Sequence, residues 1–289
     1  MEFTNIKESF ESIMIIVPHQ DDELLMSAGI IKQAILENKK VTVVMVTNGD
    51  YEAEDYNIGR ARLRETLSGL SILGLTKENI VFLGYADTGM PEENSFIANL
   101  YNKKNADEVV QSYCSNKTYG LEEKVDFHTE RFGIAASYTR NNLYNDLKTV
   151  LDEYNPEAIF TTSEYDFHGD HKYLYLFLID ILNELRKGRG YNPVLFTGIV
   201  HSCAGDDKWP VREEEIKEFT CPELLEESTD LKWKDRVSHR VPESMMDINR
   251  DRNLKYQAIT KHVTALKPDA VEYLFSFVKA NEVFWKVNW

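Results

Sequence analysis

The stretch IMIIVPHQDDELLMSAGII (13–31) decides the fold. IMIIV (13–17) has the pattern of a buried strand, and 23–40 places apolar residues at helical spacing before a basic end that suits a helix C-terminus. The same order of strand and helix returns in VTVVMVT (41–47), ARLRETLSGLSILG (61–74) and NIVFLGY (79–85). Strands that alternate with helices predict an α/β fold with a mostly parallel sheet and helices on both faces.

The rest of the chain continues this pattern and interrupts it twice. We predict helices over 140–154, 171–187, 251–266 and 270–280, strands over 157–162 and 193–200, and an edge strand over 282–287. Residues 91–135 are expected to be a long insertion over one face of the sheet, or else a disordered excursion. Residues 201–245 are expected to be loop-rich, and EEEIKEF (213–219) within them has the composition of a solvated helix face. No linker divides the chain, so 1–289 is expected to form a single domain.

Composition excludes some classes of partner. The 289 residues carry a formal net charge of −15, which repels phosphate backbones, so no nucleic-acid partner is expected. Three widely spaced cysteines argue against a disulfide framework or a cysteine zinc site. We find neither a signal-peptide pattern nor an apolar run of about 18–20 residues, so we expect a cytoplasmic protein without a membrane span. Homo-oligomerisation is left open.

VPHQDDE (17–23) directly follows the first strand and is the densest group of chemically active residues. Sites in doubly wound sheets form beyond the carboxyl ends of the strands. If a helix begins just after Pro18, His19 and Asp22 face the same side and could share a metal ion. Asp21 would lie about 100° round the helix from Asp22, beside the ion, where a base is needed. The alternative is a helix N-terminus whose acids complement the dipole.

FHGDH (167–171) follows the strand predicted at 157–162 and forms a second cluster. His168 and His171 are again three residues apart. Together the two clusters offer three histidine or carboxylate ligands, the number with which a catalytic zinc ion keeps its fourth position for water. HGDH alone could be a polar loop before a helix, but two such clusters at strand ends of one sheet favour a zinc site.

Several segments resemble the PIG-L/LmbE-like deacetylases. PHQDDE (18–23) is similar to the (A/P)HPDDE signature of that family, and HGDH (168–171) is similar to its HxDH motif. Weaker similarities are TNGD (47–50) to a TxGE/D turn, RLRE with ILGL (62–65, 72–75) to an RxxE…LG helix, and FLGYADTGM (82–90) to a strand followed by DSGM. The resemblance covers 13–90 and 140–187. Gln20 departs from the proline of the family, which leaves the turn less pre-organised, and the insertion leaves the substrate class open.

The resemblance implies a Rossmann-like three-layer sandwich and a zinc-dependent hydrolase. The expected reaction removes the N-acetyl group from an N-acetylglucosamine-type sugar or glycoconjugate and releases acetate and a free amine. Carried over position by position, the resemblance implies one zinc ion per chain, with the ligands His19, Asp22 and His171. It also implies roles for four further residues: Asp21 as general base, a protonated His168 stabilising the oxyanion, Asp170 orienting His168, and Asp87 as a partner close to the ligands.

Other side chains are weaker candidates for contact with an amino-sugar conjugate. Arg62 and Arg140 could hold substrate hydroxyls or a phosphate, but Arg62 could instead pair with Glu65, and Arg140 could lie on a helix surface. Tyr113 and Tyr119 could stack on a sugar ring, although core packing is the commoner role of such residues. The remaining histidines are isolated in the sequence and are interpreted as structural: His128, His201, His239 and His262.

Three other functions are weighed against the deacetylase. A metal phosphoesterase would use similar residues, but such enzymes usually hold two metals and more acidic ligands. A nucleotide-binding module is disfavoured because neither G-x-G-x-x-G nor a P-loop is present. A non-catalytic relative with the same fold is disfavoured because the base and the ligands are intact.

Overall fold

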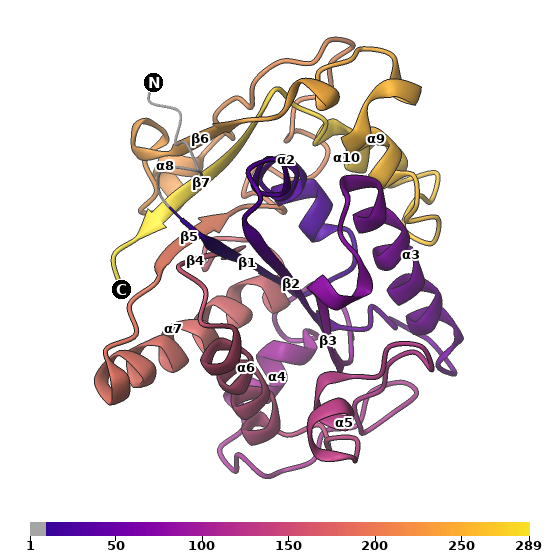
Figure 1. Ribbon diagram of the computed structural model, residues 1–289, viewed down its shortest axis with the longest axis vertical. Helices are drawn as coiled ribbons and strands as arrows, with labels where there is room; N and C mark the ends of the chain where they lie inside the picture. The colour runs from indigo at the N-terminus through magenta and orange to yellow at the C-terminus, as the bar shows by residue number, and fades with distance from the viewer. Residues whose placement is uncertain (1–9) are drawn as a thin grey trace.

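The computed structural model describes residues 10–289, which contain a seven-stranded sheet (Figure 1). The strand order is β3-β2-β1-β4-β5-β7-β6. The first five strands pair in parallel, and β7 is antiparallel to both β5 and β6. The strands are β1 (Ser12–Val17), β2 (Lys40–Thr47), β3 (Ile80–Tyr85), β4 (Ala158–Thr162), β5 (Val194–Gly198), β6 (Val237–Arg240) and β7 (Asn281–Val287).

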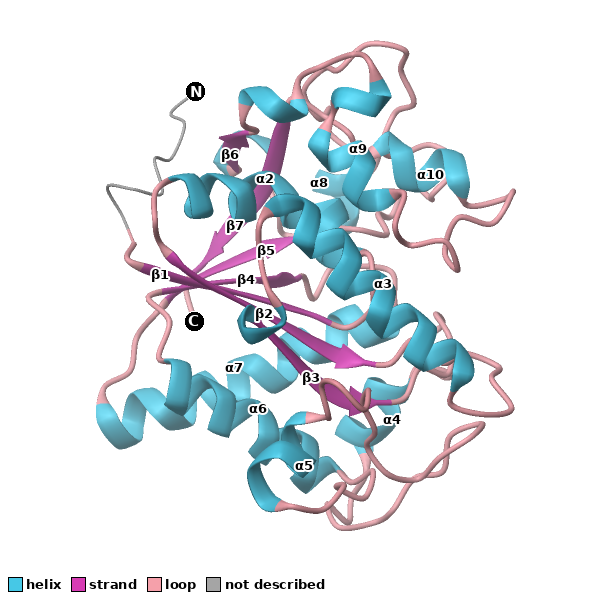
Figure 2. Cartoon of the chain, turned by 45° about the vertical axis from the view of Figure 1, so that its right-hand side comes forward, coloured by secondary structure: helices cyan, strands magenta, loops and turns pink. Residues whose placement is uncertain are grey.

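Helices cover both faces of the sheet (Figure 2). One face carries α2 (Asp22–Leu36), α3 (Asn57–Leu73), α9 (Leu254–Ile259) and α10 (Val271–Ser276). The other carries α4 (Phe96–Asn102), α5 (Phe127–Phe132), α6 (Arg140–Tyr154) and α7 (Gly169–Arg189). Side chains alternate along β1 and so enter both cores, Ile15 and Val17 on the α2 side and Met14 and Ile16 on the α7 side. The predicted three-layer α/β fold is confirmed.

The strand order places a crevice at the carboxyl ends of β1 and β4. From β1 the chain moves outward through β2 to β3, and it then crosses back to β4 on the other side of β1. Open parallel sheets bind ligands at such a reversal, because the loops leaving the two strands diverge to opposite faces. Val17 and Thr162 end these neighbouring strands. The turns that follow them therefore emerge side by side.

The insertion at 91–135 is ordered and lies over the α7 face of the sheet. Phe96, Ile97, Leu100 and Phe127 belong to the core on that face, and α4 packs along α7. Tyr119 donates its backbone N–H to the carbonyl of Gly84, which ties the insertion to β3. In this structure the insertion therefore packs against one face of the sheet.

Three expectations about the C-terminal part need correction. The strand at 282–287 is not an edge strand, because β6 pairs with the free side of β7. EEEIKEF (213–219) is not helical and follows an irregular path. The expected helices at 251–266 and 270–280 form only over the shorter ranges of α9 and α10, and 201–245 includes the short helix α8 (Leu225–Ser228) as well as β6.

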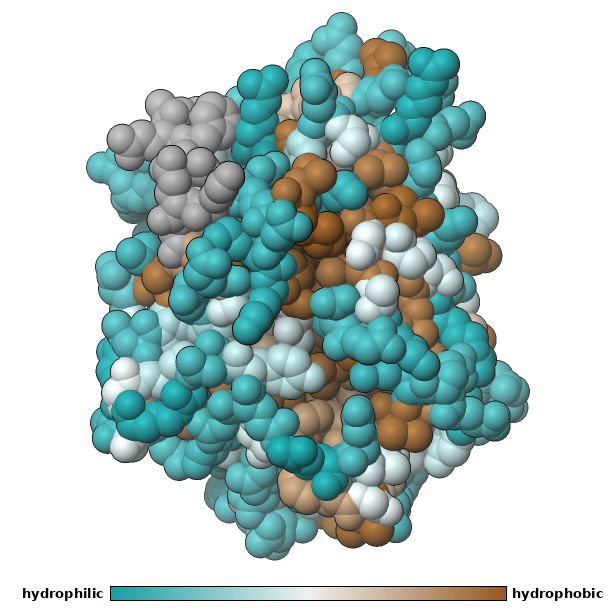
Figure 3. Space-filling view, viewed as in Figure 1, coloured by the Kyte–Doolittle hydropathy of each residue, from teal (hydrophilic) through white to brown (hydrophobic). Residues whose placement is uncertain are grey.

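Hydrophilic side chains cover most of the face seen in Figure 3, as the acidic composition leads one to expect. Hydrophobic residues are visible on the surface of this face in the region of α2 and α3 (Figure 3). Within residues 10–289, no helix combines the length and the apolar character that crossing a bilayer requires.

Candidate metal centre

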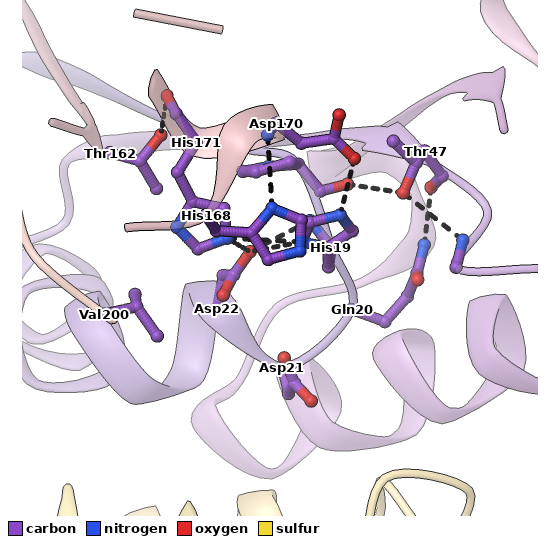
Figure 4. Close-up of polar contacts among 12 residues, drawn as sticks. His19, Gln20, Asp21, Asp22, Thr47, Thr162, His168, Asp170, His171 and Val200 are labelled. Carbon is purple, nitrogen blue, oxygen red and sulfur yellow. Dashed lines mark hydrogen bonds and ion pairs between the residues drawn. The ribbon is translucent and has the colours of Figure 1, made fainter. Parts of the chain in front are cut away.

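Two turns at adjacent strand ends bring three side chains together (Figure 4). His19 and Asp22 come from the turn between β1 and α2, and His171 comes from the first turn of α7. Nδ1 of His19 lies 3.2 Å from Nε2 of His171 and 3.5 Å from Oδ2 of Asp22. The same Asp22 oxygen lies 3.3 Å from Nε2 of His171. The side chains that were predicted as metal ligands thus meet, and all three are buried.

The triangle of these atoms has the dimensions of a zinc site. Ligand atoms about 2.0–2.1 Å from a tetrahedral zinc ion lie roughly 3.3–3.4 Å from one another. The observed edges of 3.2, 3.3 and 3.5 Å agree with this spacing. A second possible set is His19, His168 and His171, whose ligand atoms lie within 4.8 Å of one another. We favour the set with Asp22 because it includes a carboxylate, which balances part of the charge of the ion.

Each histidine of the triangle has a carboxylate beside its other ring nitrogen. Oδ2 of Asp170 lies 3.1 Å from Nε2 of His19. Oδ2 of Asp166 lies 3.2 Å from Nδ1 of His171, within ion-pair distance although outside regular hydrogen-bond geometry. Metal-binding histidines commonly have such carboxylates, which fix the ring and leave the other nitrogen free for the metal. This pairing supports the assignment of both rings as ligands.

The same carboxylates set the charge of the histidines. Burial lowers the pKa of His171, but Asp166 and Asp22 outweigh burial and raise that pKa to about 10. Burial also lowers the pKa of His19, and nearby carboxylates, Asp87 first, raise it well above 6.5. Burial raises the pKa of Asp22, but the charge of His171 holds it well below 3.8. Without a metal the carboxylates therefore favour the protonated forms of these rings, so metal binding would release protons.

His168 lies beside the triangle as a hydrogen-bond donor. Its ring stacks on His171 with centroids 4.8 Å apart. The backbone N–H of Asp170 donates to Nδ1 of His168 over 3.1 Å, so the ring proton is on Nε2. Burial, together with the charges of His19 and His171, lowers the pKa of His168 well below 6.5. In the neutral ring the donor is therefore Nε2–H, and the protonated His168 that the resemblance implies stays a prediction.

Asp170 acts differently from the expectation that its side chain orients His168. Its carboxylate contacts His19 through Oδ2 and accepts the backbone N–H of Ile97 through Oδ1 over 2.7 Å. Only its backbone N–H contacts His168. The Asp170 side chain therefore orients His19 and ties it to the start of α4.

Asp21 lies to one side of this network (Figure 4). Its φ of 107° is unusual for a residue other than glycine, and its backbone N–H donates to Oε2 of Glu23 over 3.0 Å. Burial raises the pKa of Asp21 to about 6, and the guanidinium of Arg62, 3.7 Å away, opposes this rise. A carboxyl group that titrates near pH 6 suits a general base working near neutrality.

Arg62 and Gln20 hold the turns around the centre in place. Arg62 donates to the carbonyls of Gln20, over 2.8 Å, and Gly49, over 3.1 Å. The side chain of Gln20 donates to the carbonyl of Thr47 over 2.6 Å, so it links the turns after β1 and β2 where the family has a proline. A Cβ at Gly49 would collide with both side chains, and its φ is 62°. Arg62 does not pair with Glu65, whose carboxylate accepts hydrogen bonds from Thr264 instead.

Asp87 lies close to the ligands after β3. Its carboxylate belongs to a group of three side chains, His19, Asp87 and Asp170, whose ligand atoms lie within 4.8 Å of one another. Its backbone N–H donates to Asp50, which also accepts the hydroxyl hydrogen of Tyr119 over 2.8 Å. Tyr119 is therefore a buried anchor of the insertion and is not available to stack on a sugar.

The other residues considered as weak candidates lie in separate parts of the molecule. The guanidinium of Arg140 lies 5.1 Å from the ring centre of Tyr101, and no described contact joins it to the centre. Tyr113 is 52% exposed and packs edge-on against Tyr51. His128 pairs with Asp146, and Nε2 of the buried His262 lies 3.5 Å from Oε1 of Glu23.

A groove with a volume of about 610 Å³ adjoins the centre. Its wall shares Asp166 and Gly169 with the turn that carries the ligands. Exposed Phe167 and Met90 line it together with acidic residues such as Glu92. A groove of this size can hold a small molecule, although none of the candidate metal ligands lines it.

Two residues at the centre were missed in the sequence. Asp166 was overlooked, although it follows β4 by four residues and precedes His171 by five. His201 was interpreted as isolated, but its ring lies 5.4 Å from that of His171 and 5.6 Å from that of His168. Its position in the sequence could have indicated a place at the centre, because His201 follows the end of β5, the strand next to β4.

Comparison with known proteins agrees with this geometry. The family described as PIG-L, GlcNAc-PI de-N-acetylase, matches residues 14–182, which include both turns that carry the candidate metal ligands. Among curated proteins no significant match is found.

Solved structures with the same fold come from enzymes of more than one kind. N,N'-diacetylchitobiose deacetylase from Pyrococcus horikoshii is 15% identical, over 99% of this chain and 87% of that chain, with a TM-score of 0.56. A zinc-inhibited form of teicoplanin deacetylase is 14% identical, over 95% of this chain and 97% of that chain, with a TM-score of 0.53. The 4-carboxy-2-hydroxymuconate hydratase of Pseudomonas putida is 12% identical, over 96% of each chain, with a TM-score of 0.50. Such distant likeness shows a shared fold, which does not by itself assign a reaction.

The family match does not depend on these distant likenesses. It spans more than half of the chain, from the first residues of β1 to the middle of α7, and so includes each side chain of the metal triangle. The chain therefore belongs to the PIG-L family of GlcNAc-PI de-N-acetylases.

Proposed function

We propose that this protein hydrolyses the N-acetyl group of an N-acetylglucosamine-type sugar or glycoconjugate and uses one zinc ion per chain. The observation that carries the proposal is the convergence of His19, Asp22 and His171 within 3.2–3.5 Å, with a carboxyl group of raised pKa, Asp21, in the same turn. When bound, zinc supplies Lewis acidity, which polarises an amide carbonyl and lowers the pKa of water.

The side chains around the triangle have complementary roles in this proposal. Asp21 accepts a proton from the attacking water and returns it to the departing amine. The Nε2–H of His168 donates a hydrogen bond to the oxyanion that forms on the acetyl group. Arg62 keeps Asp21 ionised by its positive charge, and Asp170 and Asp166 hold the two histidine ligands in orientation.

The groove beside the centre supports a neutral sugar conjugate as substrate. It is lined by apolar and acidic side chains, with Lys172 already paired to Glu92. A phosphate would meet carboxylates in this groove, whereas sugar hydroxyls and an amine product would find acceptors. Two structural neighbours are deacetylases whose names include diacetylchitobiose and teicoplanin.

An acetate-release assay tests the proposal. Metal-stripped protein is incubated with N-acetylglucosamine, N,N'-diacetylchitobiose and N-acetylglucosaminyl conjugates while zinc is added in fractions of an equivalent, since one neighbour has a zinc-inhibited form. We expect activity to rise up to one equivalent of zinc. Asp21→Asn should lower kcat by roughly 10² or more while zinc stays bound. His128→Gln, which alters a histidine–aspartate pair on α5, is the control for general damage.

Other results would favour the alternative functions. Phosphate release from a phosphoester with two metals per chain would favour a phosphoesterase. Zinc binding without acetate release from any of these sugars would favour a non-catalytic relative.

A further inference from the structure

His201 is a fourth imidazole at the metal centre, and it lies outside the residues that match the family, 14–182. Its ring centre lies 5.4 Å from that of His171 and 5.6 Å from that of His168. Oδ2 of Asp166, the carboxylate beside His171, accepts the backbone N–H groups of Val200, over 2.7 Å, and His201, over 3.2 Å. The carboxylate beside a predicted ligand therefore also fixes the position of His201.

The side chain of His201 is fixed through one ring nitrogen only. Nδ1 lies 2.9 Å from Oδ2 of Asp206 and 3.4 Å from the hydroxyl of Tyr273. The Tyr273 hydroxyl donates its hydrogen to the carbonyl of Val200 over 2.8 Å, so toward His201 it presents a lone pair. Both neighbours of Nδ1 are therefore acceptors, and the neutral ring carries its proton on Nδ1. Nε2 then presents a lone pair.

Nε2 of His201 has no partner among residues 10–289, and the side chain is 19% exposed. The ring stacks on Tyr273 with centroids 5.6 Å apart, so it is held rigidly beside the triangle. A rigid, accessible acceptor at this place is suited to bind a donor group of a substrate.

From this geometry we infer that His201 is a substrate-binding residue whose Nε2 accepts a hydrogen bond from an O–H or N–H of the amino sugar, next to the acetyl group. This inference rests on the proposed deacetylase function. Asp206 and Tyr273 then also contribute to substrate specificity, because they determine which ring nitrogen of His201 carries the proton. A ligand without a donor at this position would be bound less tightly.

Two substitutions of His201 distinguish the contribution of the hydrogen-bond acceptor from that of ring packing. His201→Phe keeps a ring that can stack on Tyr273 but has no acceptor, whereas His201→Gln places an amide oxygen near the position of Nε2. His128→Gln is the matched control, because His128 also pairs through Nδ1 with an aspartate but lies on α5. For each protein we would measure KM and kcat for acetate release, zinc content, and the Kd of N-acetylglucosamine for the metal-free protein by calorimetry.

We expect His201→Phe to raise KM and Kd about 5- to 10-fold, as loss of one hydrogen bond predicts, with zinc content unchanged. His201→Gln should recover most of this loss, and His128→Gln should match the wild type. Unchanged KM and Kd in His201→Phe would overturn the inference while leaving the deacetylase function intact. Loss of zinc from His201→Phe would also overturn it, because His201 would then be a ligand. Absence of acetate release by the wild type would overturn both proposals.

Discussion

Asp166 lies 3.2 Å from Nδ1 of His171 and at the same time accepts the backbone N–H of Val200 over 2.7 Å. One carboxylate thus joins a predicted metal ligand on α7 to the segment that follows β5. Burial raises the pKa of Asp166, but the charge of His171, together with smaller contributions from His201 and from the backbone N–H of His168, holds the pKa below 3.8. Asp166 is therefore ionised near neutral pH and can keep the Nδ1 proton of His171 in place when Nε2 binds a metal.

Asp166→Asn should weaken zinc binding about 10- to 100-fold, the usual effect of losing a carboxylate behind a histidine ligand. The neutral amide cannot hold the Nδ1 proton of His171 as a carboxylate does. Competition with a chromogenic chelator at pH 7.5 gives the zinc Kd. Asp146→Asn, which alters the pair between His128 on α5 and Asp146 on α6, is the control. An unchanged zinc Kd in Asp166→Asn would show that Asp166 does not support the ligand.

Asp21 should make the metal-free protein less stable as the pH rises. Burial raises its pKa in the folded state to about 6, against 3.8 in the unfolded chain, so folding disfavours the carboxylate. The destabilisation is absent below about pH 4, grows as the pH rises toward 6, and then stays constant. Two pKa units correspond to on the order of 2–3 kcal/mol at pH 7. Asp21→Asn removes the charge, and asparagine tolerates a positive φ.

Urea unfolding of metal-free wild type and Asp21→Asn at pH 4 and pH 7 measures this effect. The variant should have the larger free energy of unfolding at pH 7, and the difference should nearly vanish at pH 4. The shifted pKa of His171 is present in both proteins, so the difference reports Asp21 together with the groups it interacts with, His19 and Glu23. If the difference is the same at both pH values, the pKa of Asp21 is not raised.

Arg62 should set the acidic limb of the pH–activity profile. Its guanidinium lies 3.7 Å from Oδ2 of Asp21 and lowers the pKa of that carboxyl group. In Arg62→Gln the pKa of Asp21 should rise further, by about one unit, so kcat/KM should fall more at pH 6 than at pH 8. Arg64→Gln on the same helix is the control, because Arg64 pairs with exposed Glu123. A uniform loss at all pH values would mean that Arg62 acts only through its contacts with the turns.

The elements that position the centre were predictable because their signals are local. β1 contains the apolar run 13–17, and β4 is a short run of apolar residues and threonines. The helix α6 begins and ends at the predicted residues because Thr139 caps its start and Asn155 adopts a left-handed conformation at its end. Spacing also predicted that His19 and Asp22 would face the same side, whereas the choice of His171 rather than His168 came from the resemblance to the family. Nothing local predicted β6, since VSHR (237–240) becomes a strand only by pairing with β7. The pairing of each histidine with its carboxylate, His19 with Asp170 and His171 with Asp166, likewise depends on how α7 packs against the end of β1.

Lys255 shows most clearly what the sequence could not reveal. It lies in a predicted amphipathic helix and has the appearance of an ordinary surface lysine, yet it is fully buried. Its Nζ donates to Glu282 on β7 over 2.8 Å and to the carbonyl of Leu25 in α2 over 2.8 Å. Glu282 in turn accepts the backbone N–H groups of Gly29, over 2.8 Å, and Ile30, over 3.0 Å. A Cβ at position 29 would approach Glu282, so this glycine allows the carboxylate to reach the helix backbone.

Breaking this ion pair should destabilise the protein strongly. Lys255→Met leaves the carboxylate of Glu282 buried without a counter-charge, which costs about 3–5 kcal/mol. Glu282→Gln leaves Lys255 buried without a counter-charge and should cost a similar amount. In the double variant Lys255→Met with Glu282→Gln neither charge remains, and the glutamine oxygen can still accept from the backbone of α2. Its loss of stability should therefore be well below the sum of the two single losses. Urea unfolding of the four proteins gives the coupling energy. Losses that simply add would mean that the two side chains stabilise α2 independently rather than as a pair.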